Sequence, residues 1–452
     1  MSFENLNLRN INTLLNNSMS APAVGRTTLI GNTVLKEPPA IPSLSNGIVF
    51  KGDEHDFVFS QEQLSKGCLI LGSTGSGKTT IFKSALNHSI PSMTENDVMF
   101  VFDSKGDFYS KYSSGNDCVV ISARDEDADI ASNWNIYGEL FDAKGSFKSL
   151  DIYAREISKA LFKGMESPTQ PFFHMAAADV FAAILGAFCR DAQANGNYST
   201  LNNRTLTDFI SGAEVKDIYK LTDKYPKYRY IHSYLGSAGS MTTQALGVLG
   251  YLYGMANSMF VGPFGDSACT AGQFSVRRLM REKKRRIIFL EYDLMLGETL
   301  SPIYSLFFDL AAKEALSTGK GNSYFVVDEM NLLPHCTMFE PLINYGRSRG
   351  TKILSGLQSI NQLYKNYGVE EGKALAAGFV NAICLNSVDY DTRRHISERF
   401  GSTYENISYG GMNIQREGFT VEDSGIHNLK VGEAFVDLAG CDPFKFKFKY
   451  VA

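Results

Sequence analysis

The chain has 452 residues, of which 44% are hydrophobic and 20% are charged. These fractions are typical of soluble globular proteins and exclude the disordered, collagen-like and coiled-coil classes. Lys plus Arg number 44 and Asp plus Glu number 48, which gives a net charge of -4. Any nucleic acid would therefore have to bind a local basic surface, because the chain has no overall cationic field.

The seven cysteines are far apart and form no CxxC pair, which argues against a disulfide scaffold or a zinc ribbon. The first residues lack the basic and apolar regions of a signal peptide. The longest apolar runs, around 172–188 and 246–260, are broken by polar residues and glycines. We therefore expect a cytoplasmic protein whose sequence encodes no transmembrane anchor.

The chain length corresponds to roughly three domain-equivalents. Residues 1–47 hold a run with Asn12, Asn16 and Asn17 and four prolines between Pro22 and Pro42, and they show no sustained periodicity. We interpret them as an extended N-terminal arm or as a segment that contacts other subunits. From residue 48, short apolar runs alternate with polar-faced helical segments, which predicts a mostly parallel sheet with crossover helices. The expected strands are 68–71, 98–102, 119–121, 287–292, 324–327, 352–357 and 382–385.

Residues 146–255 lack strand signals, and their apolar residues recur at helical spacing. We expect an all-α inserted domain here, with Thr205 or Thr207 capping the helix that enters Phe209. The nucleotide-binding domain would then be discontinuous, covering residues 48–145 and 256–452. Near the C-terminus of this domain, Phe and Lys alternate over 444–449, which predicts a half-exposed strand whose lysines protect a sheet edge.

The segment LILGSTGSGKTT fits the pattern G-x-x-x-x-G-K-[ST] and lies between an apolar strand and a helical stretch. This order of strand, loop and helix favours a phosphate-binding P-loop over a glycine-rich turn that only resembles one. Lys78 would neutralise phosphate oxygens and Thr79 would offer its hydroxyl to Mg²⁺. The expected nucleotide-binding residues are Gly72, Ser73, Thr74, Gly75, Ser76, Gly77, Lys78, Thr79 and Thr80.

A second apolar strand, 324–327, ends in Asp328 and Glu329. Acids at the carboxyl end of a buried strand beside a P-loop can bind Mg²⁺ and position the attacking water. We assign Asp328 to the metal and Glu329 to the water as general base. The alternative is a surface strand that ends in two solvated acids, and Glu291 and Asp293 also end a strand, after a less regular apolar run.

Three polar residues follow this strand at places where they could act on a nucleotide. Gln358 ends the next predicted strand, where a sensor could contact the γ-phosphate or the attacking water. Arg347 and Arg349, between Gly346 and Gly350, precede that strand and could reach the nucleotide of a neighbouring subunit. The alternative for both arginines is a solvated turn.

As a set, these motifs resemble the coupling proteins of conjugation and type IV secretion systems, of the TraG/TraD and TrwB type, within the FtsK/HerA-like DNA translocases. The resemblance spans about residues 48–440. It rests on the P-loop, FDSKGDFYSKY (102–112), SNWNIYG (132–138), VVDEMNLL (326–333), GRSRG with QSINQLYKNYG (346–368), and DTRRHISERFG (391–401).

The resemblance implies a RecA-like α/β fold with an inserted all-α domain, and a hexameric ATPase that translocates DNA without sequence specificity. It implies that Lys78 and Thr79 bind ATP and Mg²⁺, that Asp328 and Glu329 are the metal and catalytic acids, and that Gln358 is the sensor. Arg347 is the expected finger acting in trans, with Arg349 as the second choice. The implied partners are a relaxase-like or effector protein and membrane-embedded secretion components.

Family members usually begin with transmembrane helices, and this sequence shows none. Either the anchor is missing from this chain, or the protein is a soluble member that docks through another protein at the cytoplasmic face of the inner membrane. Two alternative functions stay open: a docking platform that nucleotide assembles, and a viral or phage DNA-packaging or assembly ATPase. A positioned base at Glu329 favours turnover over the docking platform.

Two runs are candidates for DNA contact. Residues 277–286, RRLMREKKRR, could bind phosphates, although a solvated helix end explains the same charges. Residues 224–234 interleave tyrosines with Lys and Arg, which suits base stacking, although a packed tyrosine corner of the helical domain explains them equally. The histidines and cysteines show no ligand spacing, so Mg²⁺ is the only metal that we expect.

Overall fold

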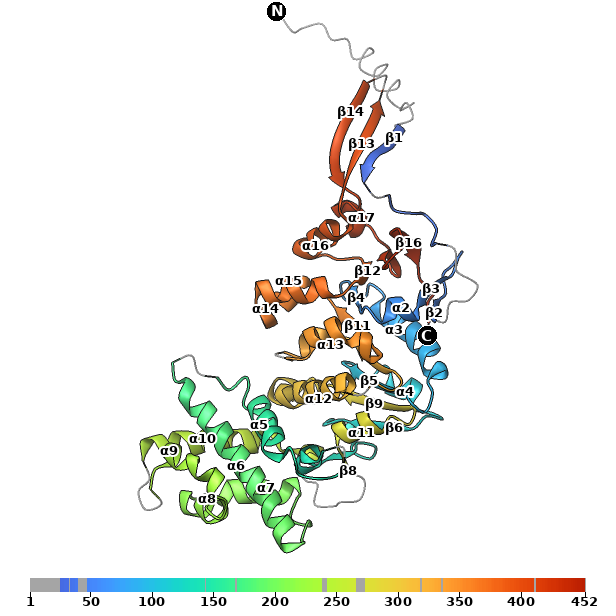
Figure 1. Cartoon of the computed structure of the whole chain (residues 1–452). Coiled ribbons are helices and arrows are strands. Elements are labelled where there is room, and N and C mark those ends of the chain that lie inside the picture. The colour runs from blue at the N-terminus through green and yellow to red at the C-terminus, as the bar shows by residue number, and fades with distance from the viewer. Residues whose placement is uncertain are drawn as a thin grey trace, which may run out of the picture.

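The computed structural model describes residues 25–31, 33–39, 47–142, 144–166, 169–237, 242–265, 273–317, 319–334, 336–409 and 412–451. A nine-stranded sheet forms the centre of the molecule, and its strands are stacked from top to bottom in Figure 1. In spatial order the strands are β16 (Phe444–Lys447), β15 (Glu433–Asp437), β12 (Asn381–Leu385), β4 (Cys68–Leu71), β11 (Thr351–Leu357), β10 (Ser323–Val327), β5 (Val98–Asp103), β9 (Arg286–Glu291) and β6 (Cys118–Ile121).

Every neighbouring pair from β12 to β6 is parallel, and β15 and β16 join antiparallel at one edge. The seven predicted strands and the expected mostly parallel sheet are therefore confirmed. β16 is the edge strand, with Phe444 and Phe446 buried and Lys445 exposed, as its alternation predicts. β15 has no clear signal in the sequence, and this five-residue strand is defined only by its pairing with β12 and β16.

The strands are apolar on both sides, and helices accordingly cover both faces of the sheet. Along β4, Cys68 and Ile70 pack into one core with α3, whereas Leu69 and Leu71 pack into the other. In Figure 1, one face carries α2 (Gln61–Leu64), α3 (Lys78–Ser92) and α4 (Tyr109–Tyr112). The opposite face carries α12 (Gly297–Ser317), α13 (Phe339–Tyr345), α14 (Ile360–Tyr367), α15 (Val369–Gly378) and α16 (Tyr390–Phe400).

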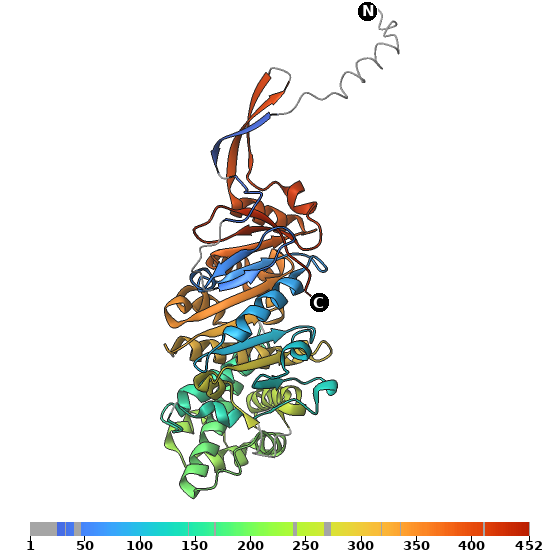
Figure 2. The ribbon, with the colours of Figure 1, turned by 90° about the vertical axis from the view of Figure 1, so that its right-hand side faces the viewer.

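A helical unit lies beyond the β6 end of the sheet (Figures 1 and 2). Its helices are α5 (Leu150–Leu161), α6 (Pro171–Asn195), α7 (Asn203–Gly212), α8 (Val215–Thr222), α9 (His232–Leu235) and α10 (Thr243–Met259). This agrees with the helical periodicity of 146–255, while the division into domains stays a prediction. The cap of α7 was predicted wrongly: Asn202 accepts from the backbone N–H of Thr205, because the helix begins earlier than the apolar pattern suggests.

α6 is long and apolar enough to cross a membrane by length and composition, but 67% of its most apolar window is buried. It packs against α5, α8 and α10, and Ala177, Phe181 and Ile184 are fully buried. We therefore regard α6 as the core helix of the helical unit.

A three-stranded antiparallel sheet projects from the opposite end of the molecule (Figure 2). It contains β1 (Gly25–Gly31), β13 (Ser402–Tyr409) and β14 (Met412–Phe419), with β13 in the middle. The segment predicted as an N-terminal arm therefore contributes a strand through residues 25–31. Asn12, Asn16, Asn17, Pro22 and Pro42, on which the arm was predicted, lie outside the described residues.

The remaining elements are short. The strands are β2 (Gly47–Phe50) with β3 (Phe57–Ser60), and β7 (Asn133–Trp134) with β8 (Gln273–Phe274), and the further helices are α11 (Val276–Glu282) and α17 (Asp423–His427). The 3₁₀ turns are η1 (Asp125–Asp127), η2 (Ile136–Leu140), η3 (Pro226–Ile231), η4 (Gly262–Phe264), η5 (Met330–Leu332) and η6 (Gly346–Arg349). Six cysteines are free thiols, and Cys269 lies outside the described residues.

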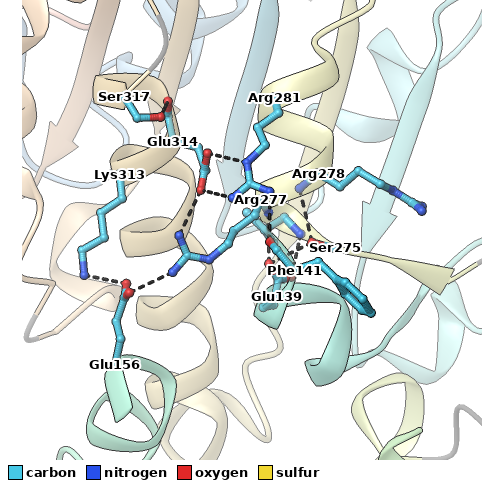
Figure 3. Close-up of polar contacts among 11 residues, drawn as sticks. Glu139, Phe141, Glu156, Ser275, Arg277, Arg278, Arg281, Lys313, Glu314 and Ser317 are labelled. Carbon is cyan, nitrogen blue, oxygen red and sulfur yellow. Dashed lines mark hydrogen bonds and ion pairs between the residues drawn. The ribbon is translucent and has the colours of Figure 1, made fainter. Parts of the chain in front are cut away.

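A buried ion-pair network joins the helical unit to the sheet (Figure 3). Arg277 on α11 binds Glu156 of α5 at 2.8 Å and Glu314 of α12 at 3.0 Å. Glu314 also binds Arg281. Glu139 of η2 is fully buried and accepts from the backbone N–H groups of Val276 and Arg277, so it holds the first turn of α11.

We expect Arg277→Ala to destabilise the protein by about 2–3 kcal/mol, because Glu314 and Glu156 lose the buried cation that they share and keep only Arg281 and Lys313 as partners. Arg278 is the matched control: it is the next residue on α11, and its side chain is 61% exposed. Arg278→Ala should cost less than about 0.5 kcal/mol. Urea unfolding of both variants measures the difference, and equal midpoints would contradict the structural role of Arg277.

Candidate nucleotide-binding site

The P-loop connects the end of β4 to the start of α3, as the motif predicts. Gly75 and Gly77 have φ angles of 78° and 112°, in the region that favours glycine. A side chain on Gly72 would meet Ser76 Oγ and Leu385 Cβ within 2.7 Å, so this glycine permits close packing. The loop is therefore shaped to present backbone N–H groups at the amino end of a fifteen-residue helix.

Two loops that the motif does not include hold the P-loop in place. The carbonyl oxygen of Asn386, after β12, accepts from the N–H of Ser73. Gly432, before β15, donates its N–H to the carbonyl of Ser76 at 2.9 Å. Only the fold brings these loops beside the P-loop, so sequence patterns could not predict these contacts.

Lys78 lies at the centre of the site and is 9% exposed. Its Nζ donates to the carbonyl oxygen of Gly72 at 2.5 Å, so the ammonium is bonded to the backbone of its own P-loop. Burial lowers the pKa of Lys78, and the charges of Glu329 and Asp328 oppose that shift. The positive charge is thus close to both acids that the sequence assigned to catalysis.

Asp328 and Glu329 follow the carboxyl end of β10, between β11 and β5. Both are buried, with 5% of each residue exposed, so the alternative of two solvated surface acids is wrong. Ser104, the residue after β5, donates from Oγ to Asp328 Oδ2 at 2.6 Å. Burial raises the pKa of Asp328, and the bond from Ser104 counteracts the rise.

A chain of hydrogen bonds connects the P-loop to Glu329. Thr74 Oγ1 donates to Gln358 Oε1 at 2.9 Å, and Gln358 Nε2 donates to Glu329 Oε2 at 2.7 Å. The other carboxylate oxygen, Glu329 Oε1, is buried and has no hydrogen-bond partner among the described residues. Burial raises the pKa of Glu329 to about 7, against the opposing effects of Gln358 and Lys78.

Arg347 and Arg349 lie away from this group of residues. They are in η6, at the amino end of β11, whereas Gln358 follows its carboxyl end. Seven extended residues span about 20 Å, which is farther than an arginine side chain reaches. Arg347 is exposed and makes a 3.3 Å ion pair with Glu62. Neither arginine therefore reaches the P-loop of its own chain.

Ser104 is a functional candidate that the sequence reasoning missed. It belongs to the run FDSKGD, which carried part of the family resemblance but was given no role. A small polar residue directly after an apolar strand was the available signal. That the residue contacts Asp328, 224 positions later, depends on β5 and β10 being neighbours.

The two runs considered for DNA contact are largely used inside the fold. Arg277 and Lys283 are buried, and Arg285 donates to the carbonyls of Met93 and Ile90 at the end of α3. In the second run, Tyr228 is buried and bonds Asp151, and Tyr225 bonds Asp191. The tyrosines of 224–234 therefore form the packed corner that was the alternative to base stacking. Several basic side chains of 277–286 are buried or bonded within the fold, so this run is not simply a solvated helix end.

A scan against protein-family models matches residues 57–425 to the type IV secretion-system coupling protein DNA-binding domain. This match covers most of the chain and includes every candidate site residue. The chain belongs to this family. The resemblance inferred from the motifs is therefore confirmed.

Solved structures agree with this assignment at the level of the fold. The bacterial conjugative coupling protein TrwBdeltaN70 is similar over 96% of both chains, with a TM-score of 0.73 at 17% identity. VirB4 of Thermoanaerobacter pseudethanolicus is similar over 91% of this chain and 98% of its own, with a TM-score of 0.53 at 14% identity. A search of the curated proteins finds no match. The RecA-like P-loop fold with an all-α insertion is confirmed.

The raised pKa of Glu329 predicts a pH-dependent stability. Between the ordinary pKa of 4.5 and about 7, the folded state keeps a proton that the unfolded state has lost. Stability is therefore lost as the pH rises through this window, by about 3 kcal/mol in total. We expect Glu329→Gln to unfold like the wild type near pH 4.5 and to be more stable than the wild type at pH 8.

Urea unfolding without nucleotide at both pH values measures this effect. Glu371→Gln, which changes an exposed carboxyl group, is the control and should leave the pH dependence as it is in the wild type. A Glu329→Gln variant with the wild-type pH dependence would contradict the placement of this carboxyl group in the core.

Proposed function

We propose that this chain is an ATP-hydrolysing DNA translocase that serves a conjugative or type IV secretion system as a ring of copies, in the simplest case a hexamer. The observation that carries the proposal is the placement of Glu329: a buried carboxyl group with one free oxygen beside Lys78 and the P-loop. A docking platform assembled by nucleotide needs no such base, and a packaging ATPase is not what the family match describes.

The residues Gly72 to Thr80 fit a triphosphate, with Lys78 as the charged contact. The oxygen ligands that Mg²⁺ prefers are present in the Thr79 hydroxyl and the Asp328 carboxylate, which Ser104 orients. When bound, Mg²⁺ would neutralise charge on the phosphates. TrwB, at 17% identity, has been solved with ADP and Mg²⁺, with an ATP analogue and with a GTP analogue, which supports this assignment.

Glu329 would take the proton of the attacking water through Oε1, because Oε2 is held by Gln358. A pKa of about 7 is well placed for this role, since the carboxylate is available near neutral pH and is still basic. Gln358 bonds both Glu329 and Thr74, so it is placed to register the state of the phosphates and to transmit it to the base.

Arg347 is the proposed finger, and a neighbouring copy must supply it because the arginine lies at the opposite edge of its own sheet. Arg349 in the same turn is the second choice. A head-to-tail contact that places the amino end of β11 over the next P-loop repeats around a closed ring. The exposure of Arg347 and its weak surface ion pair with Glu62 leave it free to make this contact.

The proposed substrate is DNA bound without sequence preference, alone or with a relaxase-like or effector protein. The family match is to a coupling protein DNA-binding domain, which supports DNA as the substrate. With a net charge of -4, the chain would have to present its basic side chains to the lumen of the ring. We place the protein in the cytoplasm, at the inner face of the membrane, where it would meet membrane-embedded secretion components.

Substitutions at Lys78 and Glu329 should separate nucleotide binding from hydrolysis. Lys78→Ala should abolish both, because it removes the charged contact to the phosphates. Glu329→Gln should keep ATP bound and lower kcat by at least about 100-fold, because it removes the base and leaves the P-loop intact. Equilibrium binding and steady-state ATPase assays measure the two properties, and an unchanged ATPase rate in Glu329→Gln would exclude the proposed role.

Mixed assemblies test the trans role of Arg347. ATPase activity per subunit should rise with protein concentration or on addition of DNA, and Arg347→Ala should lose this activity while still binding ATP. Mixing Arg347→Ala with Glu329→Gln subunits should restore partial activity, because some interfaces then combine an intact base with an intact finger. A rate independent of concentration, with no rescue on mixing, would mean that Arg347 does not act across subunits.

A further inference from the structure

The turn after β5 is held rigidly beside the nucleotide site. The carboxylate of Asp103 accepts three backbone N–H groups from this turn, those of Lys105 at 3.0 Å, Gly106 at 2.9 Å and Phe108 at 2.7 Å. Asp103 is fully buried, so these bonds fix the backbone from residue 103 to residue 108. Ser104 in the same turn bonds Asp328. The turn is thus anchored to Asp328, one of the two acids of the site.

Lys105 is the one basic residue of this turn, and its side chain is exposed. Its ammonium makes no hydrogen bond or ion pair with the part of the chain that the structure describes, whereas Lys78 is buried and bonded. An exposed lysine on a fixed backbone keeps a long, flexible side chain that can reach a ligand.

The charge of Lys105 acts on all three ionisable groups of the site. Burial is the largest cause of the pKa shifts of Lys78, Asp328 and Glu329, and Lys105 contributes to each of them. It lowers the pKa of both acids and also lowers the pKa of Lys78, which is the behaviour of a second positive charge nearby. A solvated lysine far from the site would influence none of them.

We propose that Lys105 is a second cationic contact of the γ-phosphate, on the side of the site opposite the P-loop. The strand order supports this placement: β4 carries Lys78, β5 carries Lys105, and β11 and β10, with Gln358, Asp328 and Glu329, lie between them. The terminal phosphate must approach Glu329 to react, so it lies between the two lysines. A contact from Lys105 to the γ-phosphate alone would strengthen as negative charge redistributes over that group during phosphoryl transfer to water.

This inference rests on the proposed ATP hydrolysis, but ADP provides a test that does not require turnover. ADP lacks the γ-phosphate, so Lys105→Ala should weaken binding of a non-hydrolysable ATP analogue about tenfold and change ADP binding less than twofold. We expect kcat for ATP to fall by more than tenfold. Lys105→Arg keeps the charge and should recover most of the loss.

Lys111→Ala is the matched control, because Lys111 is exposed and lies six residues later, on α4, where it contacts the ring of Tyr112. This variant should bind both nucleotides like the wild type. Equal weakening of ADP and the ATP analogue in Lys105→Ala, or no weakening of either, would overturn the proposal. If the wild type binds ATP but never hydrolyses it, the proposed function fails, and the ratio of the two affinities still decides the role of Lys105.

Discussion

The order of the strands β4, β11, β10 and β5 is the constraint on which the candidate site depends. Parallel strands end at the same edge of a sheet, so four adjacent carboxyl ends bring together residues from four distant parts of the chain. The P-loop, Gln358, the acid pair and Ser104 each follow one of these strands. The same geometry places Arg347 at the opposite edge, which makes the site incomplete within one copy if a finger is required.

Burial sets the protonation behaviour of the ionisable groups in the candidate site. Burying two adjacent carboxyl groups is unfavourable in free energy. The charge of Lys78 and the hydrogen bonds from Ser104 and Gln358 offset part of this penalty. Glu329 nevertheless keeps one oxygen without a partner. Burial raises the pKa of this carboxyl group to about 7, so the burial that lowers stability at neutral pH also suits the group to act as a general base.

The helical unit is fixed to the sheet by buried charges as well as by apolar packing. α12 begins just beyond β9, at the edge where the acids lie, and near its end Glu314 joins the network around Arg277 (Figure 3). Through Glu156 the same arginine holds α5, and its guanidinium lies 4.2 Å from the ring of Tyr153. A helix of 21 residues thus joins the nucleotide edge to the helical unit.

The sequence by itself determined the parallel strands, the P-loop and the acid pair, because these signals are local: apolar runs buried on both faces, and motifs with fixed spacing. Contacts between distant residues were decided only by the tertiary structure. The sequence alone suggests that the basic run 277–286 is exposed. In the fold, Glu156 of α5 and Glu314 of α12 form ion pairs with its arginines, and Glu139 of η2 accepts from the backbone N–H of Arg277. Residues 25–31 become a strand only because β13 is there to pair with them. Ser104 gains its role only where β5 meets β10, since hydrogen-bond geometry depends on neighbours in space and not in sequence.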